Sequence, residues 1–228
     1  MTRWISLVVM GLLLAPNLPA AEKSASLPGP GVSEKEAAEG FVSLFDGRSL
    51  AGWQGATKGY QAENGVLVCL EKGGGNLYTT KQFADFIFRF EFKLQSGGNN
   101  GVGLRVPDRR VRTPSQSSME IQILDDSHPK YKNLHDYQYH GSIYGVVPAK
   151  RGHLKPVGQW NSEEILCQGY HVKVTLNGAV IVDADLEKLG FRRLNGQPGE
   201  GLKNTKGYLG FLGHGSRVEF RNLRIKEL

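Results

Sequence analysis

Four phenylalanines occupy every second position of the segment Asp85–Gln95, and this pattern limits the fold more than any other stretch. The rings of Phe86, Phe88, Phe90 and Phe92 must share one face of a strand, because successive side chains point to opposite faces. We interpret that face as core rather than as a stack that binds a ligand. The row of rings therefore predicts a strand whose phenylalanine face is buried against a second layer of the fold.

Short strand-like segments separated by turn residues fill most of the remaining chain. Asn177–Gly178 between two such segments is a strong hairpin signal. Thirty glycines without a three-residue period indicate many turns. The segments are 41–45, 66–70, 77–80, 102–106, 119–124, 142–147, 165–168, 170–176, 179–183, 208–212 and 218–225. They predict an all-β fold, a two-sheet antiparallel jelly-roll sandwich.

The first twenty residues have the pattern of a secretory signal peptide. Arg3 precedes the apolar run Trp4–Leu14, and the small residue Ala20 follows a short tail. We expect cleavage after Ala20 or Ala21 and hence an exported protein, periplasmic or extracellular. A retained N-terminal anchor is the alternative, although the run is short for a membrane span.

Three regions follow from these patterns. Residues 1–20 are the expected signal peptide, residues 21–40 a flexible linker with one helical turn near Glu34–Glu39, and residues 41–228 the β-sandwich domain. The net charge of +6 is spread along the chain with acids between the basic residues, so we expect no nucleic-acid partner. Cys69 and Cys167 lie in apolar segments; buried free thiols are favoured, and a single bridge is the alternative.

The segment from Ser118 to Val147 contains the candidate site. Its first part alternates, which places Glu120 and Gln122 together on the face opposite Met119 and Ile121. A long stretch rich in His, Tyr and Asp follows before the next strand-like run. Such an insertion is costly to order unless it is functional, so we interpret it as the wall of a site.

Several motifs resemble the 3-keto-disaccharide hydrolase domain family. They are FVSLFDG at 41–47, EIQILDD at 120–126, GSIY at 141–144, GYLGFLGHG at 207–215 and VEFRNLRI at 218–225. The resemblance extends from Gly40 to Leu228 in order and spacing. It implies a fold similar to concanavalin-like lectins and glucanases, and an exported carbohydrate-active domain whose partner is a glycan or a 3-keto disaccharide.

The resemblance also implies a reaction. A ketone on carbon 3 acidifies the hydrogen on carbon 2, so a base removes it, the substituent on carbon 1 leaves, and water adds. This chemistry needs a base, a group that stabilises the enolate oxygen, and an acid for the leaving group. We assign His140 as the proton acceptor, with Asp125 as the alternative base if burial raises its pKa. Glu120 would bind a substrate hydroxyl or protonate the leaving group.

The expected substrate-binding side chains come from several segments. Arg105 and Lys150 are candidates for the enolate oxygen, and Tyr144 and Trp160 for stacking on a sugar; each has a structural alternative, such as a solvated charge or a core ring. The full set is Arg105, Gln122, His135, Tyr144, Lys150, Trp160 and His214. The histidines lack the spacing of a helical zinc site, so no cofactor is assigned and a divalent metal is left open.

Two other functions compete with this one. A non-catalytic carbohydrate-binding module would need aromatic platforms and amides but no base beside an acid. A jelly-roll endoglucanase would carry acids at alternating positions of one strand, where this chain has Glu120, Gln122 and the displaced Asp125. The crowding of His and acid side chains favours the enzyme, and the amide at position 122 disfavours the endoglucanase.

Overall fold

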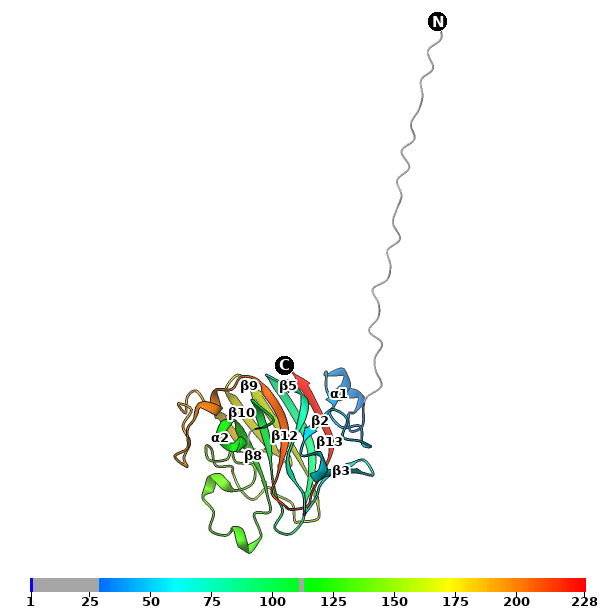
Figure 1. Cartoon of the computed structure of the whole chain (residues 1–228). Helices are drawn as coiled ribbons and strands as arrows, with labels where there is room; N and C mark the ends of the chain where they lie inside the picture. The colour runs from blue at the N-terminus through cyan, green and yellow to red at the C-terminus, as the bar shows by residue number, and fades with distance from the viewer. Residues whose placement is uncertain (2–28, 111–112) are drawn as a thin grey trace.

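Two antiparallel sheets pack face to face in the computed structural model, which describes Met1, residues 29–110 and residues 113–228 (Figure 1). The larger sheet has the strand order β11 (Ala179–Asp185), β10 (His171–Leu176), β9 (Trp160–Gln168), β6 (Phe86–Leu94), β13 (Val218–Glu227), β4 (Val66–Cys69) and β3 (Tyr60–Glu63), and β1 (Val42–Ser43) also pairs with β13. The smaller has the order β2 (Trp53–Gly55), β5 (Gly75–Phe83), β12 (Gly207–Gly213), β7 (Asn99–Val106) and β8 (Met119–Leu124). The predicted jelly-roll sandwich is confirmed.

The phenylalanine row of β6 lies between the sheets. All four rings are buried, and Phe90 contacts Phe211 of β12 edge-on at 6.2 Å between centroids. Phe211 in turn stacks on Phe220 of β13 at 3.9 Å. The core interpretation of this face is therefore confirmed.

The hairpin between β10 and β11 turns at the predicted Asn177–Gly178 pair. Both residues have positive φ, 50° and 87°, as a tight two-residue turn requires. Cys69 and Cys167 are buried free thiols, which confirms the interpretation favoured for them.

Loops and short helices occupy the remainder. The segment after β8 extends from one end of the sandwich, with 3₁₀ turns at Pro129–Tyr131 and Asp136–Gln138 (Figure 1). Residues 142–147, which we predicted as a strand, form only isolated bridges through Ile143. The other short helices are α2 (Pro114–Ser117) and 3₁₀ turns at Thr57–Gly59 and Glu200–Lys203. Within the described ranges, no helix is long and apolar enough to cross a membrane.

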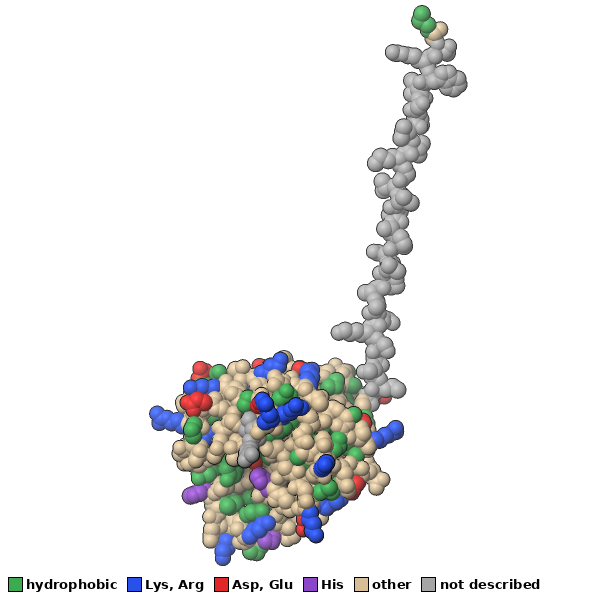
Figure 2. Space-filling model, viewed as in Figure 1, with side chains coloured by type: hydrophobic (Ala, Val, Ile, Leu, Met, Phe, Trp, Pro, Cys, Tyr) green, Lys and Arg blue, Asp and Glu red, His purple; other side chains and the backbone are tan. Residues whose placement is uncertain are grey.

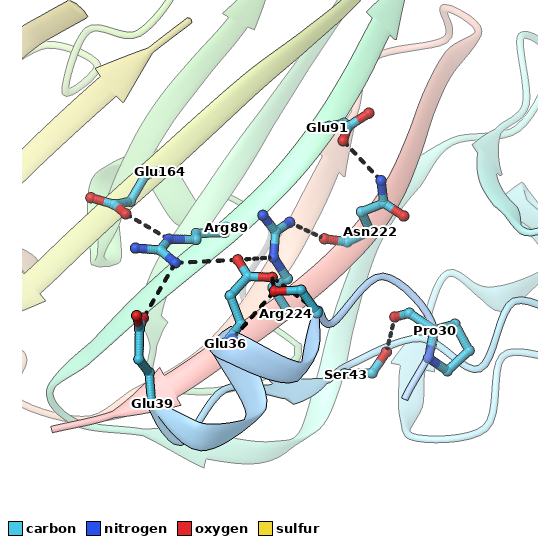
Figure 3. A network of polar contacts seen from close by, with 10 residues as sticks. Pro30, Glu36, Glu39, Ser43, Arg89, Glu91, Glu164, Asn222 and Arg224 are labelled. Carbon is cyan, nitrogen blue, oxygen red and sulfur yellow. Dashed lines mark hydrogen bonds and ion pairs between the residues drawn. The ribbon is translucent and has the colours of Figure 1, made fainter. Parts of the chain in front are cut away.

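Helix α1 (Glu34–Ala38) fulfils the expected helical turn before residue 41. Glu36 accepts hydrogen bonds from Arg224 of β13 at 2.7 Å and from Arg89 of β6 at 3.2 Å (Figure 3). The described part of the predicted linker is thus tied to the larger sheet by ion pairs. The predicted signal peptide, apart from Met1, and residues 21–28 lie outside the described residues.

Candidate functional site

A row of residues crosses the outer face of the smaller sheet from β2 to β8. The strand registers pair Gln54 with Tyr78, Tyr78 with Gly210, Gly210 with Gly103, and Gly103 with Glu120. Cross-strand partners share a face, so these five residues form one line across the sheet. Glu120 thus faces away from the core, as its alternation with Met119 and Ile121 predicted.

Glycines at the centre of this face let neighbouring side chains lie flat on the backbone. A Cβ on Gly101 would lie 2.2 Å from Oε1 of Glu120, and one on Gly210 would lie 2.4 Å from Cδ1 of Tyr78. Real Cβ atoms do not approach so closely. Side chains at positions 101 and 210 would therefore displace Glu120 and Tyr78.

Glu120 and His214 form the acid–imidazole pair of this face. His214 Nε2 lies 3.8 Å from Glu120 Oε1; the carboxylate side chain is 7% exposed and the imidazole 52% exposed. His214 comes from the turn between β12 and β13, where Gly215 has a φ of 72°. The pair therefore combines a carboxylate held by a strand with a histidine that solvent reaches.

Arg193 and Tyr78 interact with the same carboxylate and were not predicted. Burial lowers the pKa of Arg193, and the charge of Glu120 opposes that change. Burial, and to a smaller extent Glu120, raises the pKa of the Tyr78 phenol. Arg193 donates to the carbonyl of Ser118 at 2.6 Å, while its Nη1 has no hydrogen-bond partner among the described residues. Arg193 sits in a polar loop with no motif around it, so only the fold brings it to Glu120.

The segment after β8 forms a wall along the free edge of that strand. Tyr144 donates its backbone N–H to the Glu120 carbonyl at 2.8 Å. Gln138 joins the wall by donating to the Tyr144 hydroxyl at 2.9 Å and by accepting from Gln122 at its carbonyl at 3.3 Å. His135 is exposed and its ring stacks on Tyr137, which meets Tyr144 edge-on. Gln122 and Tyr144 therefore both contact this wall beside Glu120, and His135 joins it through Tyr137.

His140, the predicted base, is enclosed in the core instead. Its Nε2 lies 3.1 Å from Glu163 of β9, and both side chains are at most 1% exposed. Its Nδ1 accepts from the Leu124 N–H at 3.3 Å, and its ring packs on Phe92. Gly141, with a φ of 76°, turns the chain after a 3₁₀ turn, so His140 faces inward. A group enclosed in this way does not reach a substrate on the outer face.

Asp125 does not fit the role of alternative base either. Burial alone would raise its pKa, but hydrogen bonds from Ser127 and from the Gly97 N–H outweigh burial and lower it. The Gly97 N–H lies 2.7 Å from its carboxylate. Asp125 therefore stabilises the turn after β8 as an ion.

Arg105 lies inside the fold rather than on the Glu120 face. One residue of β12 lies between Tyr208 and Gly210, whereas two residues of β7 lie between their partners Val106 and Gly103, so β7 contains an extra residue there. Arg105 has a φ of 52° at this bulge, which turns its side chain away from the Glu120 face. The guanidinium pairs with Asp85 at 2.8 Å and donates to the carbonyl of Ala84.

Lys150 and Trp160 also lie elsewhere. Trp160 belongs to the larger sheet, where Arg221 sits over its ring at 4.1 Å from the centroid. Lys150 donates its backbone N–H to the carbonyl of Ile181 of β11. The pKa of Asp183 is lowered chiefly by its hydrogen bond with His171, to which the charge of Lys150 adds a smaller effect. Neither contacts the row from Gln54 to Glu120 through any hydrogen bond found in the described ranges.

In residues 29–110 and 113–228, no group of three or more His, Cys, Asp or Glu side chains is arranged to hold a metal ion. On the face shown in Figure 2, Lys and Arg side chains occur in several separate places.

Comparison with known proteins places this chain in a family. A 3-keto-disaccharide hydrolase of Bacteroides thetaiotaomicron is 29% identical over 84% of this chain and 79% of its own length. Two crystal structures from Parabacteroides distasonis, of proteins provisionally described as glycosyl hydrolases, superpose with TM-scores of 0.77 and 0.74 at 29% and 30% identity, covering 86% and 82% of this chain and 98% and 99% of theirs. The family described as the 3-keto-alpha-glucoside-1,2-lyase-like domain matches residues 40–226. The chain belongs to this 3-keto-alpha-glucoside-1,2-lyase-like family.

Proposed function

We propose that the chain is an exported enzyme that cleaves glycosides already oxidised at carbon 3, and that Glu120 and His214 carry its chemistry. The proposal depends on the pairing of Glu120 with His214 on the glycine-lined face of the smaller sheet. The chain's membership of this family gives that pair its proposed chemistry. A relative named as a 3-keto-disaccharide hydrolase supports the substrate class. Export is inferred from the pattern of Arg3, the apolar run and Ala20.

The proposed reaction is an elimination followed by hydration. A base removes the proton on carbon 2, and the electrons of that C–H bond form an enolate with the carbonyl at carbon 3. The enolate then expels the oxygen substituent on carbon 1, which leaves with a proton. Water adds across the resulting double bond, so one water molecule is consumed for each glycoside cleaved.

His214 is the proposed proton acceptor. An imidazole that solvent reaches offers a ring nitrogen that can accept a proton as a general base. The Glu120 carboxylate, 3.8 Å away, would stabilise the imidazolium that forms. Catalytic hydrogen bonds are often long without substrate and shorten in the complex. This pair replaces His140 and Asp125 in the base role.

Arg193 and Tyr78 are proposed to support this pair from below rather than to contact the substrate. The Tyr78 hydroxyl and the Nη1 of Arg193 are both buried. The charge of Arg193 faces that of Glu120, and the Tyr78 phenol stays protonated because burial raises its pKa. His135, Tyr137 and Tyr144 line the wall beside them and present aromatic edges to a sugar.

The test compares one disaccharide in its 3-keto and unoxidised forms. We expect turnover of the 3-keto form only, with deuterium from D₂O entering carbon 2. Glu120→Gln and His214→Gln should each lower turnover by about 10²-fold or more while the fold survives. His171→Gln is the matched control, because His171 forms a similar pair with Asp183 at 2.6 Å on the larger sheet.

Two outcomes would contradict the proposal. Unchanged turnover in both variants would move the chemistry away from this face. Glycan binding by the native chain without turnover of any 3-keto sugar would instead support the non-catalytic binding module.

A further inference from the structure

A cavity of about 600 Å³ lies at the end of β8, apart from the Glu120 face. Its walls are the turn 125–127 and the loop 151–157, and the ends of β6 and β9 close it through Leu94 and Asn161. Asp125 is five residues beyond Glu120, or about 17 Å in extended chain. The cavity is therefore separate from the proposed catalytic groups.

The cavity combines an apolar surface with one charged pair. Leu94, Leu154, Pro156 and Val157 provide the apolar part. Asp126 and Arg151 provide the charges, with Arg151 Nε lying 3.8 Å from Asp126 Oδ2. Binding sites for small molecules typically have this composition, mostly apolar with a few placed polar groups.

Asp126 and Arg151 are each fixed by other contacts, yet they do not bond to each other. The His140 N–H donates to Oδ1 of Asp126 at 2.9 Å. The Arg151 guanidinium lies 3.6 Å from the centroid of the Tyr139 ring. A separation of 3.8 Å exceeds a hydrogen bond, so the Asp126 carboxylate and the Arg151 guanidinium face one another as an open ion pair.

The other two charged side chains around the cavity, Lys155 and Asp125, already form hydrogen bonds with the protein. Lys155 donates through Nζ to the Trp160 carbonyl at 3.0 Å, and Asp125 accepts from Ser127 and Gly97. Asp126 and Arg151 have opposite signs, so the charges that face the cavity cancel. A strongly anionic or cationic ligand would find no net attraction there.

We propose that this cavity binds a neutral sugar ring through two adjacent hydroxyls. One hydroxyl donates to Oδ2 of Asp126, and its neighbour accepts from Arg151. The C–H face of the ring packs on Leu154 and Val157. A carboxylate and a guanidinium side by side match a vicinal diol, because they offer one acceptor and one donor at its spacing.

In the experiment, methyl β-D-glucopyranoside is titrated into the mature chain, and amide NMR monitors binding. We expect saturable shifts at Ser127, Gly152 and Asn161.

Asp126→Asn and Arg151→Gln should each weaken binding about tenfold or more, since a hydrogen bond to a charged group is lost. Asp183→Asn, at an exposed pair on another part of the surface, is the matched control and should leave affinity unchanged. Cyclohexanol, which has a single hydroxyl, should not saturate the site.

Val157→Trp provides a variant that leaves the charged pair intact. Val157 is exposed on its loop, and the larger ring should fill the cavity and abolish the shifts. Shifts confined to Gly101 and Gly103, equal binding by Asp126→Asn, or no saturable shift would overturn the proposal. The assay needs no 3-keto sugar, so its result is independent of the catalytic proposal.

Discussion

Replacement of Glu36 by Gln tests the ion pairs that attach helix α1 to the larger sheet. The Glu36 carboxylate accepts from Arg224, Arg89 and its own N-cap residue Ser33 (Figure 3). Burial by itself would raise the pKa of Glu36, but the bonds from Arg224 and Ser33 outweigh burial and lower it from 4.5 to about 2. The folded state therefore favours the ionised form.

The magnitude follows from that pKa. Each pKa unit corresponds to about 1.4 kcal/mol, so ionised Glu36 stabilises the fold by about 3 kcal/mol. Because the folded pKa lies below the unfolded one, this stabilisation is complete above pH 4.5 and is lost as the pH falls towards 2. Glu36→Gln removes the charge and keeps the shape, so it should cost about 2–3 kcal/mol at pH 7.

Urea denaturation of both proteins at pH 7 and at pH 2.5 measures the effect, with unchanged m-values as the condition for comparison. The difference between them should shrink markedly at the lower pH. Glu34→Gln, at an exposed position of the same helix, is the control and should change stability by less than about 0.5 kcal/mol. A Glu36→Gln effect that is equally small, or equal at both pH values, would refute the reasoning.

Two further predictions concern the core and the N-terminus. Phe90→Ala should destabilise the fold by about 3–5 kcal/mol in the same assay, because its ring is fully buried among Phe88, Phe92, Phe211 and Phe220; a loss below about 1 kcal/mol would argue against a core position. The secreted or periplasmic protein should begin near Ala21 or Glu22 on N-terminal sequencing, and material that begins at Met1 or Thr2 would contradict export with cleavage.

Regular alternation made the strands predictable from the sequence. The β6 rings, the Glu120 and Gln122 face and the Asn177–Gly178 turn depend on local rules, which hold wherever a strand keeps its period of two. Glu120 is therefore found on the expected face.

Arg105 shows where such rules fail. In the sequence, position 105 alternates with Val102 and Leu104, which predicts that its side chain faces away from the core. The bulge in β7 inserts an extra residue, so the side chain of Arg105 points to the opposite face. Nothing in the sequence near Arg105 predicts its positive φ. The bulge arises only when β7 pairs with β12, which lies about a hundred residues later in the chain. Arg193 and Tyr78 were missed for the same reason, since only the packed sheet brings them to Glu120.

The free edge of β8 explains why His140 was misassigned and why it still matters. The backbone from Gly141 to Tyr144 closes this edge, with Gly141 donating to the Gln122 carbonyl at 2.8 Å. An exposed strand edge invites pairing with other chains, so covering it also protects the sheet. The hydrogen bond from Gly141 fixes the backbone at this edge. The side chain of the preceding residue, His140, therefore points into the core and contacts Glu163. His140 thus anchors the wall that carries Tyr144, and it influences the Glu120 face through position rather than through contact with substrate.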